Sequence, residues 1–360
     1  MVLCAAVLLF VADAALFRTR WYNRYRDPGS STGRLEAVIE TELTRENWAK
    51  VVVVLGDSAM AEGFSARLAN FSQAAPGYQF ANAAVPGSSP RCWYYMLRDM
   101  DRRLHRYSTI VIPVRYYDDR DFGLVDPANQ IADVHYLAAR LRFYDGPLFA
   151  ATFHDASFAL QAFVEALFKG LTYRQDFQAL LDNPQQRMAA IKEKRIDPAW
   201  HEYNYPGLDG TLAGLNVNWQ DRTFTFPTVL SNRDQQFLRE SLFTPLPKPN
   251  QADRDYRLLW LGRIVERYRN TATRIVFMRP PIRPLHRPDE PPPAAAGAVR
   301  ELAKRPGVAL LDEHVFDEFE RPELFAEARH LNREGAARFT KALVRQIAQD
   351  AGVTPGATGR

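Results

Sequence analysis

The chain has 360 residues, of which 46% are hydrophobic and 24% are charged, a balance typical of a folded globular protein. This length allows one large α/β domain or a domain that carries a substantial insertion. The net charge of +4 is small for the length and no basic tail is present, which argues against a dedicated nucleic-acid-binding protein. The two cysteines, Cys4 and Cys92, show no zinc-ligand spacing, and we expect no structural disulfide between them.

Residues 1–17 form a run that is apolar except for Asp13. A helix that crosses a membrane needs roughly 20 apolar residues, so this run is short. No basic segment precedes it and no good cleavage site follows it, which favours a signal anchor over a cleaved signal peptide. The alternative is an ordinary buried helix. Four arginines between residues 18 and 26 come next, although basic residues prefer the cytoplasmic side of a membrane.

Residues 18–49 are expected to form a linker and a leading helix, with the Pro/Gly/Ser-rich segment 27–33 as the linker. Beyond them, short apolar runs alternate with helical patterns. Strands are predicted at 51–55, within 80–89, and at 109–114, 274–278 and 308–312, and helices at 93–104, 253–270 and 335–348. This alternation predicts an α/β fold whose parallel strands are joined by right-handed crossovers.

Residues from about 120 to 250 interrupt this alternation. They contain helical stretches at 131–141 and 157–171, and a segment of loops and short strands at 207–226. We interpret this region as a mostly helical insertion over the sheet, because long insertions in α/β enzymes often cover the active site. The tail, residues 351–360, is predicted to be disordered.

One stretch near the start combines a strand pattern with a sharp turn. Val51 to Leu55 lead directly into Gly56, Asp57 and Ser58, and the helix-tolerant sequence Ala-Met-Ala-Glu follows. An apolar run bounded by glycine is typical of a strand buried on both faces. Ser58 is therefore expected at the carboxyl end of a central strand, where open α/β sheets bind ligands, and its amide can face an anion. The alternative is that Asp57 and Ser58 only form a turn and a helix cap.

A second block lies near the C-terminal end, where Glu327-Ala-Arg-His330-Leu-Asn precedes Gly335. Together with the Gly-Asp-Ser58 block, it resembles the motifs of the SGNH (GDSL-type) hydrolases and acyltransferases. That family usually ends in Asp-x-x-His, and Glu327 stands where the aspartate is usual. The resemblance covers roughly residues 50–120 and 255–345 and leaves the insertion unmatched. It implies a catalytic domain of residues 50–350, built as a three-layer α/β/α sandwich with a parallel, flavodoxin-like sheet.

The resemblance implies a catalytic triad. A serine nucleophile needs a base, a group that orients the base, and donors for the oxyanion. Ser58 is the implied nucleophile, His330 the base and Glu327 the orienting acid. Asp312 and Asp317 are alternatives should Glu327 point to solvent. For His330 the alternative is an ordinary histidine at the surface or at a helix N-terminus.

For the oxyanion hole, the resemblance implies the amides of Ser58 and Gly87, although Gly87 could merely supply a turn. The family's third block is usually Gly-x-Asn-Asp, and its asparagine completes the hole. Here the third block begins at Arg115, and Tyr117 occupies the asparagine position. A tyrosine hydroxyl can donate a hydrogen bond, but this side chain could instead pack in the core or in a lid.

Five residues are predicted to contact the substrate: Asp57, Asn82, Arg115, Arg279 and Arg283. Arg115 could supply positive charge near the site. Arg279 and Arg283 follow a predicted strand and could recognise an anionic saccharide, because arginine pairs well with carboxylates and phosphates. The alternative for these two arginines is a solvated, proline-rich loop.

The chain looks most like the membrane-tethered branch of the family, which adds or removes O-acyl groups on cell-envelope polymers. This resemblance implies an esterase or O-acyltransferase that acts on a cell-envelope polysaccharide through an acyl-serine intermediate, without a metal or an organic cofactor. The expected partners are an acylated saccharide or acyl donor, the membrane, and a membrane-bound acyl exporter, with the catalytic body in the periplasm. The alternative is a non-catalytic SGNH-fold envelope protein that binds carbohydrate or assists polysaccharide assembly.

Overall fold

The structure is a computed structural model that describes residues 2–45, 50–72, 74–120, 126–196, 207–226, 230–288 and 294–350. It divides into two compact units. Unit 1 comprises residues 1–44, 91–100 and 123–200, and unit 2 comprises residues 45–90, 101–122 and 201–360. The predicted disordered tail and the end of the predicted leading helix, residues 46–49, lie outside the described residues.

Unit 2 is built on a five-stranded sheet with the strand order β2-β1-β3-β6-β7, in which all neighbours are parallel. The strands are β1 (Val51–Val54), β2 (Gln79–Asn82), β3 (Thr109–Pro113), β6 (Arg274–Met278) and β7 (Val308–Leu310). This sheet confirms the predicted α/β class, the parallel arrangement and the five predicted strands. Val51 to Val54 form a central strand because they are β-branched and are buried on both faces, as a central parallel strand requires.

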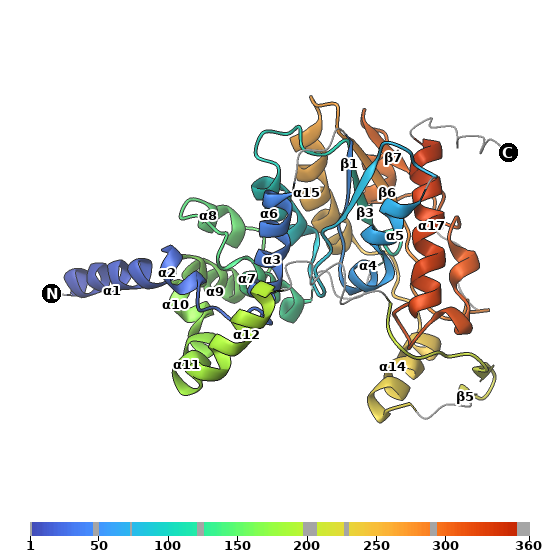
Figure 1. The fold of residues 1–360 in the computed structure, drawn as a ribbon, viewed down its shortest axis with the longest axis horizontal. Coiled ribbons are helices and arrows are strands. Elements are labelled where there is room, and N and C mark those ends of the chain that lie inside the picture. The colour runs from blue at the N-terminus through green and yellow to red at the C-terminus, as the bar shows by residue number, and fades with distance from the viewer. Residues whose placement is uncertain are drawn as a thin grey trace. The chain divides into compact units, whose positions relative to one another are not determined.

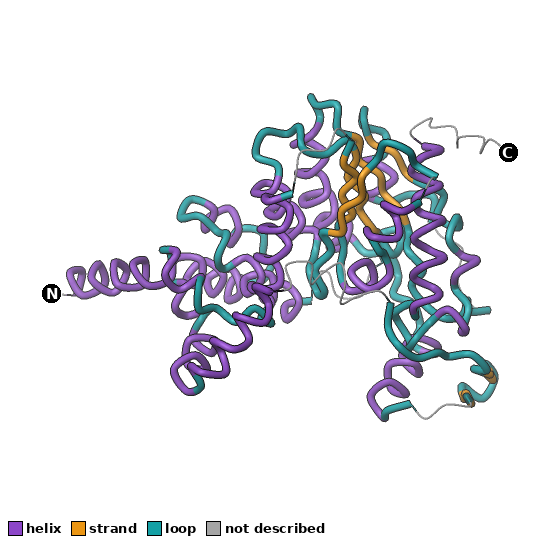
Figure 2. Tube along the Cα trace, in the orientation of Figure 1, coloured by secondary structure: helices purple, strands orange, loops and turns teal. Residues whose placement is uncertain are grey.

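Helices cover the sheet on both sides, an arrangement consistent with a three-layer sandwich. Figures 1 and 2 show α15 (Gln251–Tyr268) on one side of the strands and α17 (Arg333–Asp350) on the other. α16 (Ala298–Leu302) packs on α15, and α17 packs on α4 (Ser58–Gly63) and α5 (Ala66–Phe71). The predicted helices at 253–270 and 335–348 are thus present.

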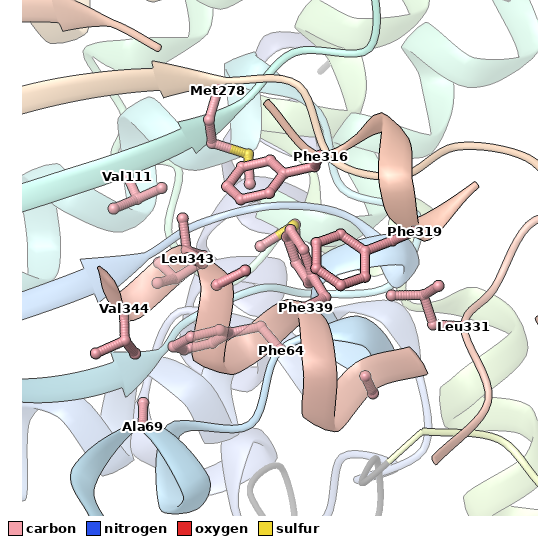
Figure 3. Close-up of a cluster of buried hydrophobic side chains, with 14 of the residues drawn as sticks. Phe64, Ala69, Val111, Met278, Phe316, Phe319, Leu331, Phe339, Leu343 and Val344 are labelled. Atoms are coloured by element: carbon pink, nitrogen blue, oxygen red, sulfur yellow. The ribbon is translucent and has the colours of Figure 1, made fainter. Parts of the chain in front are cut away.

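The core of unit 2 lies between α17 and the sheet (Figure 3). α17 contributes Phe339 and Leu343, both fully buried, and the sheet contributes Val111 and Met278. The Phe339 ring packs edge-on against Phe316, with ring centroids 5.1 Å apart. This packing anchors the start of α17, and with it the loop that immediately precedes the helix.

Residues 207–243 also belong to unit 2. They form a short antiparallel hairpin, β4 (Asn216–Asn218) and β5 (Thr223–Thr225), followed by α14 (Asn232–Phe243). The predicted loops and short strands at 207–226 are therefore confirmed. This segment lies along the loop before α17, because the Leu208 amide donates to Leu331 at 3.2 Å and the Leu212 amide donates to Phe325 at 2.9 Å. Two 3-10 turns, η1 (Asp317–Phe319) and η2 (Pro322–Leu324), precede that loop.

Unit 1 is helical throughout the residues that are described. Its helices are α1 (Val2–Phe17), α2 (Arg20–Asn23), α3 (Ser31–Thr44), α6 (Pro90–Met100), α7 (Pro127–Leu137), α8 (Asp145–Ala150), α9 (Ala156–Leu167), α10 (Lys169–Thr172), α11 (Arg174–Asp182) and α12 (Pro184–Ile196). α3 includes part of the predicted linker. α6 begins earlier than predicted because Pro90 suits a first helical position, and it ends at Met100. The region interpreted as one insertion is shared, since residues 126–196 lie in unit 1 and residues 207–250 in unit 2.

The C-terminal half of α1 contacts other helices of unit 1, whereas the described side chains of its first half are exposed. The Asp13 carboxylate accepts hydrogen bonds from the amides of Lys169 and Gly170, and Phe17 stacks on Tyr173 with ring centroids 5.7 Å apart. Among the described helices, none combines the length and the apolar character that a membrane crossing requires.

Candidate active site

Ser58, His330 and Glu327 lie in one hydrogen-bonded line. Ser58 is the first residue of α4, directly after the turn that follows β1, and its Oγ lies 2.9 Å from Nε2 of His330. Nδ1 of the same ring is hydrogen-bonded to the carboxylate of Glu327. A carboxylate only accepts, so Nδ1 carries the proton and Nε2 is left to accept the Ser58 hydroxyl proton. The two predicted blocks meet although Ser58 and His330 are 272 residues apart in sequence.

The corner before Ser58 depends on Gly56 and Asp57. Gly56 has φ +148°, and a Cβ placed there would lie 2.5 Å from Cβ of Met60. Asp57 caps α4 by accepting a hydrogen bond of 3.0 Å from the Ala59 amide. The cap predicted as the alternative role is therefore real, and it coexists with the contact between Ser58 and His330.

The loop that carries His330 is closed by Asn332. Its carboxamide accepts from the Gly335 amide at 2.9 Å and donates to the Glu323 carbonyl at 2.7 Å. Within the loop, the Ala326 amide donates to the His330 carbonyl at 3.0 Å. Gly335 packs so tightly that a Cβ would lie 2.2 Å from the Leu324 carbonyl oxygen. The Asn and the Gly of the second block thus hold the histidine loop against the start of α17.

Charges around the ring raise the pKa of His330. Burial opposes the imidazolium and lowers the pKa, but the Glu327 hydrogen bond and the carboxylates of Glu62, Glu327 and Asp57 outweigh it. The sequence reasoning missed Glu62, whose Oε2 lies 3.6 Å from Nδ1 of His330. A signal for it existed, because Glu62 follows Ser58 by four residues and so shares its face of α4.

Gly87 lies in a loop that is bound to the nucleophile corner. The Val85 amide and the Ser88 hydroxyl both donate to the Gly56 carbonyl, at 2.9 and 3.0 Å. Gly87 itself has φ +77°, so the turn predicted as its alternative role is present. Its role as an oxyanion donor stays a prediction.

Tyr117 was a wrong prediction for the oxyanion hole. Its side chain is fully buried, and its hydroxyl donates to the Leu311 carbonyl at 3.2 Å. Its amide donates to Glu313 at 3.2 Å. The side chain packs in the core of unit 2, which was the predicted alternative, because its backbone position directs the ring towards the strand end at Leu311.

Asn82 was a wrong prediction for substrate contact. Its buried carboxamide NH2 lies 2.8 Å from the Phe64 carbonyl oxygen, with those of Met60 and Ala61 at 3.3 and 3.4 Å. Its Oδ1 accepts from the Ala84 amide at 3.0 Å. Asn82 therefore ties the end of α4 to the strand β2 and helps to hold the helix that begins with Ser58.

Arg279 and Arg283 were also wrong predictions, both as saccharide contacts and as part of a solvated loop. Both are buried beside Glu320, whose side chain is fully enclosed. Arg279 lies 2.8 Å from Glu320 and 2.6 Å from Asp317, and Arg283 lies 3.3 Å from Glu320. Arginine favours carboxylates, as predicted, but these carboxylates come from the chain itself.

The predicted alternatives to Glu327 lie elsewhere. Asp312 accepts a hydrogen bond from the His314 amide at 2.8 Å, and Asp317 contacts the His314 ring at 2.7 Å. Arg115 does lie at the candidate site, paired with Asp57 at 2.8 Å and about one-third exposed. Whether Arg115 and Asp57 touch a substrate stays a prediction.

One group among the described residues has the side chains to hold a metal ion. His286, Asp317 and Glu320 place one ligand atom each within 4.8 Å of one another. The same two carboxylates already pair with Arg279 and Arg283, so a cation would have to displace guanidinium groups from a buried ion-pair cluster. The geometry therefore favours an ion-pair role for this group.

The chain matches no model of a protein family and resembles none of the curated proteins searched.

Proposed function

We propose that this protein is a serine-dependent ester hydrolase or O-acyltransferase. The observation that carries the proposal is the line from Ser58 Oγ through His330 to Glu327, at the carboxyl end of a central parallel strand. Nucleophile, base and orienting group are the three parts that acyl transfer by serine requires. The resemblance of the two blocks to the SGNH hydrolases supports the same proposal.

In the proposed mechanism, Nε2 of His330 takes the proton of Ser58 as Oγ bonds to the ester carbonyl carbon. The tetrahedral intermediate collapses by breaking the bond to the alcohol oxygen, and the imidazolium returns its proton to that alcohol. The acyl group is then held as an ester of Ser58. Water or an acceptor hydroxyl attacks it, and His330 again takes the proton. The bond from the acyl carbon to Ser58 Oγ then breaks as the imidazolium returns the proton to Oγ, which releases a carboxylic acid or a new ester.

We assign the oxyanion to backbone donors. The Ser58 amide belongs to the first turn of α4, where amides have no partner within the helix. The Gly87 amide is the second proposed donor, because its loop is hydrogen-bonded to Gly56. Tyr117 supplies no third donor, and each donor in such a hole is worth roughly 10²–10³ in rate. A slower turnover than a three-donor esterase is the expected consequence.

The proposed substrate is an acylated saccharide of a cell-envelope polymer, with acyl groups delivered by a donor or a membrane-bound exporter. This part rests on the resemblance to the membrane-tethered SGNH branch. The periplasm is the proposed location of the catalytic body, and the proposed chemistry needs no cofactor.

α1 is the proposed membrane attachment. Its exposed apolar side chains include Leu8 and Leu9, at 69% and 63% exposure, and lipid would cover such a surface favourably. An alkaline phosphatase fusion after residue 350 tests the orientation. An active fusion supports a periplasmic body, and an inactive fusion beside an active cytoplasmic reporter at the same site reverses it.

The central test is labelling by a fluorophosphonate probe. Wild type is expected to label and to release p-nitrophenol from p-nitrophenyl acetate, and Ser58→Ala is expected to do neither. The substitution removes one hydroxyl at a half-exposed corner, so the melting temperature should change little. A folded wild type without labelling would instead favour the non-catalytic alternative, in which the fold binds carbohydrate.

A further inference from the structure

Two carboxylates face one nitrogen of His330. Glu327 hydrogen-bonds to Nδ1, and Oε2 of Glu62 lies 3.6 Å from the same atom. They arrive from different elements, since Glu327 belongs to the histidine loop and Glu62 to α4. A triad needs only one acid at this position, so the second carboxylate calls for its own explanation.

We propose that Glu62 is a second acidic partner of His330, a positioning residue that stabilises the imidazolium and accepts a hydrogen bond from Nδ1–H when Glu327 turns away. This inference rests on the proposed role of His330 as the base for Ser58. Glu62 touches neither the ester nor the reacting atoms in this scheme. It acts through the ring.

The geometry of α4 supports the assignment. Residues four apart on a helix lie on one face, one turn apart. Ser58 and Glu62 have this spacing, and the imidazole spans the turn between them, with Nε2 towards Ser58 and Nδ1 towards Glu62. The Asn82 carboxamide contacts three carbonyl oxygens at the end of α4. Glu62 therefore lies on a helix whose end is hydrogen-bonded to β2. Glu327, in contrast, lies on the histidine loop.

Burial makes the charge of Glu62 effective. Its side chain is only 12% exposed, so water screens its field far less than at the surface. Nδ1 has one proton and can donate to one carboxylate at a time, which leaves the other to act by charge alone. Glu327 and Asp57 also act on the ring by charge, and the guanidinium of Arg115 is paired with Asp57. Two carboxylates therefore favour the charged ring that acyl transfer forms.

The first experiment follows the ring itself by NMR, in the Ser58→Ala background and without substrate. The His330 signal is assigned by its absence in His330→Asn. Glu62→Gln should lower the midpoint of the His330 titration by about 0.8 pH unit or more, the effect of one charge at 3.6 Å even in the dielectric of water. Glu62→Asp should keep most of the wild-type midpoint.

Glu266→Gln is the matched control, because Glu266 is half-exposed on α15, pairs with Arg269 at 2.9 Å and is not among the charges that shift the His330 pKa. It should leave the midpoint unchanged. A midpoint in folded Glu62→Gln equal to that of wild type would overturn the proposal. This result is independent of any activity, so the proposal can fail while Ser58 remains a nucleophile, and it can hold even if wild type hydrolyses no ester.

The second experiment measures kcat/KM against pH for Glu62→Gln, Glu327→Gln and the double variant. Only the neutral ring accepts a proton, so Glu62→Gln should move the rising limb to lower pH. If Glu62 replaces Glu327 as the Nδ1 partner, the double variant should lose more activity than the product of the two single losses. A product of the single losses, with the limb unmoved, would overturn the proposal in favour of a purely structural Glu62.

Discussion

Replacing Glu320 with alanine tests whether the arginine cluster of unit 2 is structural. Glu320 is fully enclosed and lies 2.8 Å from Arg279 and 3.3 Å from Arg283. It also accepts a hydrogen bond of 3.0 Å from the Ile282 amide. Glu320→Ala would remove a carboxylate that contacts both guanidinium groups and would leave their charges in a buried site.

The expected loss of stability depends on the ion pairs that the arginines keep in Glu320→Ala. Arg279 keeps Asp317, at 2.6 Å, but Asp317 is partly exposed, so water screens this pair more than the enclosed pair with Glu320. Breaking a buried ion pair by removing one partner costs about 3–5 kcal/mol. At 2–4 °C per kcal/mol for a unit of this size, the melting temperature should fall by roughly 6–20 °C.

Thermal unfolding followed by circular dichroism measures the change. Glu323→Ala is the control, because Glu323 lies three residues further along and its side chain is 53% exposed, 4.0 Å from Arg321. The control should melt within about 2 °C of wild type. A Glu320→Ala protein that melts as the control does would refute the structural role of the Glu320 ion pairs.

Four further predictions concern the residues of the candidate site. Gly56→Ala should destabilise unit 2 by about 2 kcal/mol or more, because its Cβ would overlap the Met60 side chain at φ +148°; equal melting temperatures would contradict this. Asn82→Ala should lower both the melting temperature and the rate of fluorophosphonate labelling, since α4 loses its tie to β2; unchanged labelling would show that α4 needs no such tie. The raised pKa of His330 predicts that labelling increases with pH through a midpoint above the usual histidine value. By linkage, the protonated ring adds stability that is fully present below about pH 6.5 and is lost as pH rises through the folded-state pKa, and His330→Asn should remove this slope.

The strands could be predicted because their pattern is independent of distant partners. Val51 to Val54 and Ile275 to Met278 are unbroken apolar runs, and only a buried strand suits such runs between turns. The Ser58 and His330 blocks could be matched for a similar reason, since each places its functional side chain by short-range chain geometry.

The wrong predictions of site residues have a different cause. Asn82, Arg279 and Arg283 have side chains that suit a ligand, but their partners are supplied by the chain: a carbonyl of α4 for Asn82 and Glu320 for both arginines. A residue type indicates what it can bind, not what folding brings beside it. The prediction for Tyr117 was wrong because its position in the third block does not determine which way its side chain points.

The distance in sequence between Ser58 and His330 also determines when the site can exist during synthesis. After Ser58 is made, 272 further residues must follow before His330 is joined to the chain. At roughly 5–20 residues per second, this takes on the order of 14–54 s. For that whole interval the nascent chain carries Ser58 without His330, so the hydrogen-bonded line through Ser58, His330 and Glu327 cannot form. It forms only after the C-terminal part of unit 2, which carries His330 and α17, has packed against α4.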